Sequence, residues 1–275
     1  MLSAEEYALR ATQSFTLPQT CVQIRRLLDN NKSDSTDIAK IISNDPALSA
    51  KLLKLANSAL FRFEYQIDDI DKAITVIGGE ALYNLMMAET ASSAFEHFSN
   101  DAIDLNRFWL QSVYAALVAK NLAKMARIRT SGRYFVIGLM HNIGELLVAA
   151  DTPNFATQCA EYSTDVPPWK SQENILGFCY TDCTYALLKQ WNLPSNLYQS
   201  LPNAHSETIN GTQADGLMFI VYRAALTLVE PEKFNLSNLI SHSLLQKMRL
   251  TEQDVVDSMK FAQIEAATLI SVLRS

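Results

Sequence analysis

Apolar residues recur along most of the chain at the three- and four-residue spacing that places them on one face of a helix. The run 45–56 shows this well: Asp45 is placed as an N-cap, Pro46 follows at the first helical position, and a leucine stripe comes after them. Ser3 followed by Glu6 predicts a capping box at an earlier helix. We find no convincing alternating strand, so the pattern predicts an all-α fold.

The same reading gives the later helices. Thr251 with Asp254 predicts an N-terminal capping box for the last helix, Val255–Leu273. Two longer apolar runs, Tyr134–Ala150 and Glu173–Trp191, each predict a single continuous helix.

A polar run near residue 100, with the sequence SNDAIDLN, separates two groups of predicted helices. We therefore expect two packed helical subdomains, 1–100 and 101–275, the second ending in a helical extension. Glycine and proline are scarce, at 8 each, which disfavours a turn-dense all-β fold.

Composition narrows the function classes. The formal net charge is -6 and the pI is about 5.3, so the overall field does not attract a phosphate backbone. The first residues lack the basic start and apolar stretch of a secretory signal, and no apolar run reaches the roughly 18 residues of a membrane span. The spacing of the 4 cysteines fits neither a disulfide framework nor a paired zinc site. We expect a cytoplasmic protein with no membrane association.

The segment GLMHNIGELL, residues 138–147, carries the most informative polar residues. His141 and Asn142 lie side by side in an apolar stretch, where they are costly to bury without partners. They should therefore form hydrogen bonds to other helices or line a cavity. Glu145, one turn further on, could cap the helix, pair with a cation or face solvent.

Three stretches together resemble the HD superfamily of metal-dependent phosphohydrolases: FWLQS at 108–112, GLMHNIGELL, and ENILGFCYTDCTYALLKQWNLP at 173–194. The resemblance implies that the second subdomain is an HD-like helical bundle. In that family, histidines and aspartates from several helices hold one or two metal ions that activate water against a phosphate ester.

The residues at the implied ligand positions depart from the family pattern. They are Gln111, His141, Asn142, Tyr180, His205 and Arg223. An amide cannot replace the charge of a bridging carboxylate, and an arginine at a metal site would repel the cation. We therefore expect a degenerate bundle with no catalytic residue, no metal and no cofactor, and hence no enzyme.

The N-terminal half resembles a more specific family. LPQTCVQIRRLL, DIAKIISNDPALSAKLLKLANSALF and IDDIDKAITVIGGEALYNLMMAET are similar to the hallmark stretches of the HDOD domain, the HD-related output domain of bacterial signalling proteins. The resemblance covers about residues 17–205. It implies a helical N-terminal subdomain next to the degenerate bundle, and a regulator that acts through protein contacts.

From these features we expect a non-catalytic signalling protein whose partners are other proteins, with a small-molecule ligand as a further option in the former metal pocket. Residues 61–65 contain Phe61, Phe63 and Tyr65, and these aromatics either cover the core or form a docking surface.

Two alternatives remain open from the sequence. The first is a residual metal-dependent phosphohydrolase. The second is a DNA-binding helix-turn-helix at 37–56, whose second helix offers Ser49, Lys51 and Lys54 on its outer face. Two lysines in an acidic protein are a small electrostatic footprint for nucleic acid.

Overall fold

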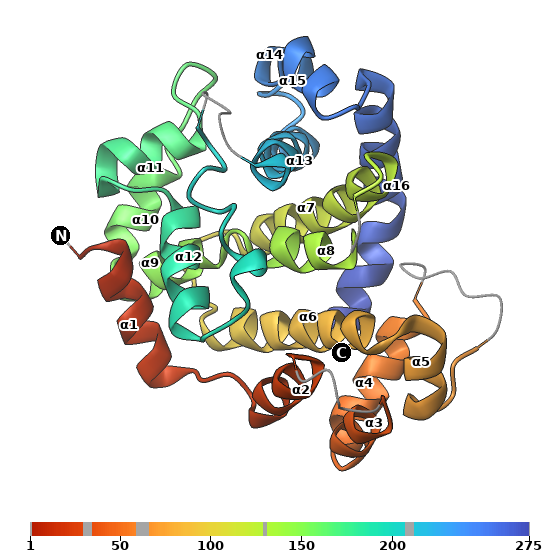
Figure 1. The fold of residues 1–275 in the computed structure, drawn as a ribbon. Helices are drawn as coiled ribbons and strands as arrows, with labels where there is room; N and C mark the ends of the chain where they lie inside the picture. The colour runs from red at the N-terminus through yellow and green to blue at the C-terminus, as the bar shows by residue number, and fades with distance from the viewer. Residues whose placement is uncertain (1, 30–34, 59–65, 129–130, 207–211, 275) are drawn as a thin grey trace. The chain divides into compact units, whose positions relative to one another are not determined.

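The fold is known from a computed structural model that describes residues 2–29, 35–58, 66–128, 131–206 and 212–274 (Figure 1). Helices account for 74% of the chain, and the described part contains no strand. This confirms the all-α prediction.

The chain divides into two compact units. The large unit consists of Met1–Thr16 and Phe95–Ile264, and the small unit of Leu17–Ala94 and Glu265–Ser275. This differs from the division at residue 100 that the sequence suggested, because each end of the chain belongs to the other unit. Of the three boundaries, the one after Thr16 lies between helices, but the other two fall inside long helices, α6 (Gly79–His97) and α16 (Glu252–Leu273), so no change of composition marks these two.

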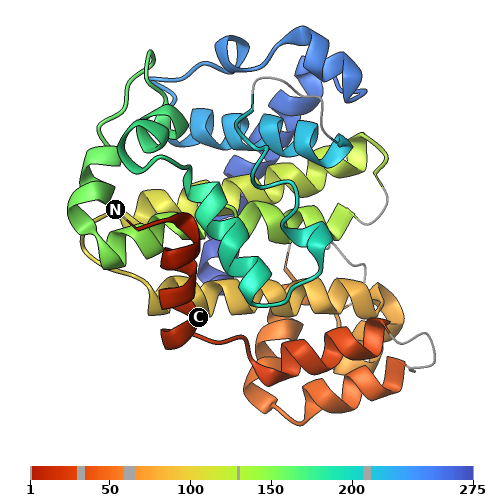
Figure 2. The ribbon, with the colours of Figure 1, turned by 60° about the vertical axis from the view of Figure 1, so that its left-hand side comes forward.

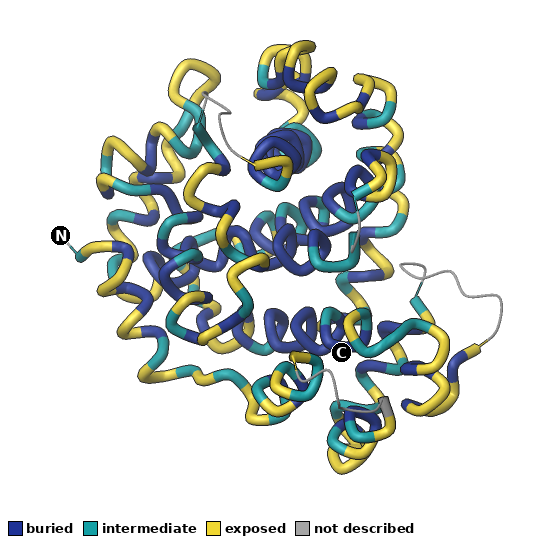
Figure 3. The backbone as a smooth tube through the Cα atoms, viewed as in Figure 1, coloured by how far each residue is buried: buried dark blue, intermediate teal, exposed yellow. Residues whose placement is uncertain are grey.

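The large unit is built around α7. Besides the end of α6 and the larger, first part of α16, its helices are α1 (Ala4–Ser14), α7 (Leu105–Met125), α8 (Ser131–Met140), α9 (Ile143–Asp151), α10 (Pro153–Cys159), α11 (Pro168–Leu176), α12 (Tyr180–Gln190), the 3-10 turn η1 (Ser195–Leu197), α13 (Gln213–Val229), α14 (Leu236–Leu239) and α15 (His242–Lys247). Helices α8 and α13 both pack on α7, and all three are buried over most of their length (Figure 3). On another side, α1 packs along α12 and α9 (Figure 2).

The small unit contains α2 (Gln19–Asp29), α3 (Ser35–Ser43), α4 (Pro46–Ala56), α5 (Ile70–Ile77) and the larger part of α6. Helix α3 contacts α2, α4 and α5. The Asn57 side chain forms two hydrogen bonds to the backbone of Ile67. Its amide donates to the Ile67 carbonyl at 2.7 Å, and its oxygen accepts from the Ile67 N–H at 2.8 Å. In the same unit, the Ser92 hydroxyl donates to the Leu273 carbonyl at 2.6 Å, which connects the chain's last helix to α6.

The helix starts follow the sequence signals. Ser3 and Glu6 form the predicted capping box, with bonds of 2.7 and 3.2 Å. The Asp45 carboxylate accepts from the Leu48 N–H at 3.0 Å, and Pro46 is the first residue of α4. Thr251 and Asp254 also bond reciprocally at the start of α16.

The two long helices predicted at 134–150 and 173–191 are each broken, so those predictions were wrong in this respect. The second break, between α11 and α12, follows Gly177, whose φ of +78° ends α11 in the left-handed conformation. The first break lies at residues 141–142, between α8 and α9. There the Thr184 hydroxyl accepts from the Gly144 N–H at 3.0 Å and donates to the His141 carbonyl at 2.9 Å. A side chain on α12 thus satisfies backbone groups that the break leaves without helical partners.

Close backbone approach requires glycine at two positions in this region. A Cβ atom at Gly138 would lie 2.5 Å from the Ala115 carbonyl oxygen of α7, and one at Gly144 would clash with the Tyr180 carbonyl of α12. In both cases the obstacle is backbone of the neighbouring helix, which cannot rotate away. The two glycines therefore set how closely α8 and α9 approach their neighbours.

We predict that Gly138→Ala destabilises the protein by about 1–3 kcal/mol or more, because the added methyl must push α8 away from α7. The free energy of unfolding from urea denaturation measures the effect. Gly79→Ala is the matched control, since its methyl would meet only the side-chain methyls of Leu28 and Ile38, at 3.0 and 3.1 Å. Equal costs for the two variants would contradict the argument from close backbone approach.

Candidate functional site

A small cavity in the large unit collects three of the residues named from the sequence. Gln111, Asn142 and Tyr180 line it, together with residues of α7, α9, α10, α11 and the 160–168 connection. Its volume is about 20 Å³. That is space for roughly one water molecule and not for an organic ligand.

The guanidinium group of Arg107 lies at this cavity, one helical turn before Gln111 on α7. It forms an ion pair with Glu145 and donates to the Gln111 amide oxygen at 3.2 Å and to the Tyr162 hydroxyl at 3.3 Å. The Glu145 side chain is only 5% exposed and that of Arg107 21%. A buried carboxylate is thus neutralised by a cation that the chain itself supplies.

Further hydrogen bonds complete this network. The Asn142 amide donates to the second carboxylate oxygen of Glu145, so both oxygens are engaged. The Tyr162 hydroxyl donates to Glu230 in turn. Of the three possibilities for Glu145, capping, pairing and solvation, the structure shows pairing.

The surroundings of the cavity keep Arg107 charged and the Tyr180 and Tyr162 hydroxyls neutral. The pKa of Arg107 is raised, chiefly by the Glu145 carboxylate, so the guanidinium keeps its charge. Burial raises the pKa of Tyr180 and of Tyr162 well above the usual range of a phenol. Both hydroxyls therefore stay neutral and cannot supply negative charge to a cation.

These residues do not fit the metal ions that the HD resemblance implies. Gln111, Asn142 and Tyr180 are neutral, the Glu145 carboxylate is paired, and a guanidinium stands among them. Metal sites of this kind need carboxylates and imidazoles converging on one point. Within the described residues, no group of three or more histidine, cysteine, aspartate or glutamate side chains is placed to hold a metal ion.

His141 is buried close to this cavity but does not line it. Its Nδ1 is 2.6 Å from the Gly138 carbonyl oxygen, and because a carbonyl can only accept, Nδ1 carries the proton. The ring stacks on Tyr222, with the centroids 4.4 Å apart. Burial lowers the pKa of His141 to about 4, so the imidazole is neutral at physiological pH.

His205 also contacts Tyr222, and both His205 and Arg223 pack against Trp169. The His205 ring is 5.8 Å from that of Tyr222 and stacks on Trp169 at 5.1 Å. The Arg223 guanidinium lies over the Trp169 ring at 4.4 Å. Burial, with the nearby Arg223 charge as a second cause, lowers the pKa of His205 well below that of a free histidine. Arg223 lines a separate, wider pocket and not the cavity at Arg107.

The six residues named from the sequence are therefore distributed over three places: the small cavity, the surroundings of Tyr222, which both histidines contact, and the pocket at Arg223. The aromatic residues proposed for docking, Phe61, Phe63 and Tyr65, lie outside the described residues.

Sequence reasoning missed Arg107, Tyr162, Glu230 and Tyr222. The spacing of Arg107 and Gln111, four residues apart on a predicted helix, is a signal that could have found the first. No local signal connects Tyr162 with Glu230, because they meet only through the fold.

The helix-turn-helix candidate does correspond to two helices in contact, α3 and α4. Two of its three outer-face residues, Ser49 and Lys51, have partners within the small unit. Lys51 is ion-paired with Glu89, and the Ser49 hydroxyl donates to the Ile42 carbonyl at 2.9 Å. These contacts reduce the positive charge that this face could offer to a phosphate backbone. In the described part of the chain, no helix is long and apolar enough to cross a membrane.

Fold and site together define the class: an all-helical protein in which Arg107 and the neutral side chains of Gln111, Asn142 and Tyr180 surround a small cavity. The comparison with protein families is more specific. Residues 15–207 match the HDOD domain, so the chain belongs to the HDOD family.

Solved structures share the fold. A protein of Marinobacter aquaeolei VT8, named for signal transduction, superposes with a TM-score of 0.75 at 18% identity, covering 96% of this chain and 60% of that one. An HDOD domain protein of Geobacter sulfurreducens has a TM-score of 0.67 at 18% identity, covering 98% and 96% of the two chains. A protein of Shewanella amazonensis SB2B, named for phosphohydrolase activity, has a TM-score of 0.65 at 20% identity, covering 92% and 97%.

An uncharacterized protein of Treponema pallidum (strain Nichols) is 27% identical over 258 residues. The match covers 90% of this chain but only 50% of that relative, so the chain spans half the length of the curated relative it matches.

We predict that Arg107→Met costs about 3–5 kcal/mol of stability, because it leaves a buried carboxylate without its cation. Glu145→Gln should cost less, since the more exposed Arg107 can reach water. The double variant should cost less than the sum of the two. Urea denaturation of the four proteins gives this cycle. Lys170→Met is the control, as it breaks an exposed ion pair with Glu173 that is worth about 0–1 kcal/mol. Additive costs in the cycle would contradict the pairing.

We also predict that stability falls on acidification between the free histidine pKa of 6.5 and the pKa of His141 in the fold, about 4. Because the folded protein holds this imidazole neutral, the unfolded chain binds more protons in that window, and stability rises with pH there. Above pH 6.5 the stabilisation is complete. His141→Gln should reduce the slope by up to about 1.4 kcal/mol per pH unit. Denaturation at several pH values measures it, with His242→Gln as an exposed-histidine control. An unchanged slope in His141→Gln would show that this histidine is not held neutral.

Proposed function

We propose that this chain is a non-catalytic, cytoplasmic signalling protein that acts by binding other proteins. The observation that carries the non-catalytic part is the Arg107–Glu145 ion pair at the cavity lined by Gln111, Asn142 and Tyr180. HD-type hydrolysis depends on a metal ion that lowers the pKa of bound water and polarises the phosphate ester. The Arg107 guanidinium cannot replace a metal ion here, because it binds no water as a ligand and so cannot lower the pKa of that water.

The signalling part of the proposal rests on family membership and on the Marinobacter neighbour, whose name refers to signal transduction. The four cysteines are free and buried, which supports a reducing compartment such as the cytoplasm.

Binding to protein is favoured over binding to DNA for two reasons. The chain carries a net charge of -6. Lys51, one of the two lysines on the candidate recognition helix, is already ion-paired with Glu89 of α6. With so little positive charge available for a phosphate backbone, we infer that the partner is a protein.

The test is capture of partners from the native host on the immobilised full chain, followed by mass spectrometry. We expect a reproducible protein partner with the wild type. Phe61→Ser/Phe63→Ser/Tyr65→Ser should capture less of it, because aromatic side chains contribute most to protein interfaces. The helical signal and melting temperature of the variant should match those of the wild type. If the variant unfolds, these aromatics belong to the core and the docking hypothesis fails at that segment.

Two further measurements separate the alternatives. Metal-dependent hydrolysis of a nucleotide or cyclic dinucleotide, abolished by His141→Ala, would contradict the non-catalytic proposal and favour the phosphohydrolase. A sequence-specific DNA footprint at physiological salt would favour the helix-turn-helix.

A further inference from the structure

A second, much larger pocket lies in the large unit, where residues 165–170 face α13 and the α14–α15 segment. Its volume is about 610 Å³, which is within the range of roughly 300–1,000 Å³ found for small-molecule sites. The cavity at Arg107, at about 20 Å³, is far too small for such a ligand.

The walls of this pocket combine aromatic and apolar surface with positive charge. Trp169, Phe219 and Leu244 contribute ring and aliphatic surface, and Arg223 and Lys170 contribute the cations. Asp165 is the carboxylate among the lining residues. Lys170 also forms an exposed ion pair with Glu173, so its charge is partly compensated, whereas Arg223 is a buried cation at the pocket wall.

Arg223 is held in a fixed orientation. Its guanidinium lies over the rings of Trp169 and Phe219, and its Nη1 donates to the carbonyl oxygens of Ala204 and Phe219, each at 3.3 Å. A planar guanidinium recognises carboxylate, phosphate and sulfonate groups through paired N–H donors. Holding it in place in advance lowers the ordering cost of binding.

The platform beneath it is equally rigid. Trp169 stacks on His205, with an interplanar angle of 8°, and the Tyr222 ring contacts both His205 and His141. These ring contacts hold the Trp169 side chain in place at the pocket wall. A flat, immobile aromatic surface next to a fixed cation suits a ligand that has both a ring and an acidic group.

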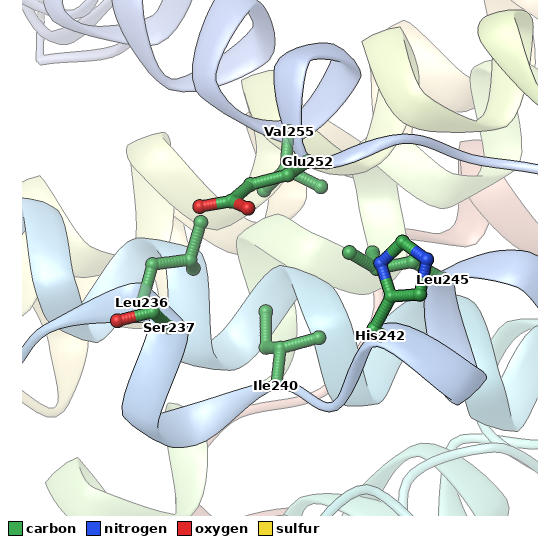
Figure 4. A pocket seen from close by; sticks show the side chains of 7 residues that line it. All are labelled: Leu236, Ser237, Ile240, His242, Leu245, Glu252 and Val255. Carbon is green, nitrogen blue, oxygen red and sulfur yellow. The ribbon is translucent and has the colours of Figure 1, made fainter.

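A neighbouring pocket gives an internal comparison. It has a volume of about 150 Å³ and lies between α14, α15 and α16 (Figure 4). Leu236, Leu245 and Val255 make it apolar, and its charged lining residue is Glu252, with His242 also at the pocket (Figure 4). Helix α14 separates the two pockets, since Ser237 and Ile240 line both. Only the larger one combines apolar walls with arginine and lysine.

We propose that the pocket at Arg223 binds a small organic anion, with its ring or apolar body against Trp169 and Phe219 and its acidic group facing Arg223 and Lys170. This goes beyond the signalling role proposed above and does not depend on it.

The test uses two fluorescent probes that share one aromatic skeleton. 8-Anilinonaphthalene-1-sulfonate carries a sulfonate, and N-phenyl-1-naphthylamine is the same molecule without it. Fluorescence titration of the full chain should show one site for the anionic probe. The neutral probe should bind at least about tenfold more weakly, because it forgoes the ionic contact. Equal affinity of the two probes would overturn the assignment of an anion site.

Matched variants locate the site. Asn238 and His242 are exposed residues of α14 and α15, and each lines one pocket and not the other. Asn238→Trp should fill the larger pocket and weaken the anionic probe about tenfold or more, whereas His242→Trp should leave its affinity unchanged. Lys170→Gln, at an exposed position, should weaken the anionic probe alone and serves if Asn238→Trp does not fold. Loss of binding in His242→Trp, or full binding in both Asn238→Trp and Lys170→Gln, would overturn the proposal.

Discussion

The ion pair between Arg107 and Glu145 is the interaction on which the rest of the site depends. Each of its partners comes from a different helix, α7 and α9, and the Glu145 carboxylate is almost wholly buried. A buried charge is tolerated only when a counter-charge and hydrogen bonds satisfy it. Here Arg107 supplies the charge, and Asn142 supplies a bond to the second oxygen. Asn142, which stands where the HD pattern has an aspartate, therefore supplies the hydrogen bond to the second oxygen of the Glu145 carboxylate.

The break between α8 and α9 makes that arrangement possible. In one continuous helix, His141 and Asn142 would be ordinary helical residues; at the break, their backbone groups need partners from elsewhere. Thr184 of α12 supplies them, and Gly144 lets α12 approach closely enough to do so. The polar residues and the glycine of this segment thus serve one local geometry, in which Asn142 reaches Glu145 and the His141 ring stacks on Tyr222.

The sequence predicted what depends on local chemistry. Helix type followed from apolar spacing, and the starts at Ser3, Asp45 and Thr251 followed from side chains that bond backbone within one turn. The break at 141–142 was missed because the group that stabilises it lies some forty residues along the chain on another helix, whereas the break after α11 has a local signal, Gly177, that was not used. The boundaries inside α6 and α16 were missed for a related reason: a helix that continues from one unit into the other carries no compositional mark.

The sequence showed that the residues at the implied metal-ligand positions differ from the HD pattern. It did not show where these residues lie in the fold. Aligned residues need not share one place, and here Arg223, named as a residue that would repel a metal ion, lies instead in a wide pocket between Trp169 and Phe219. The cation that stands at the small cavity is Arg107, from a position that the resemblance did not mark. A positive charge supplied by a side chain differs from a bound metal in one physical respect: it is covalently attached and cannot be exchanged or lost. Its pKa, raised further by Glu145, keeps it charged over the whole physiological range. The network at Arg107 therefore has the electrostatic role of a permanent structural cation, and any ligand-dependent change in this bundle must come from surfaces and pockets outside it.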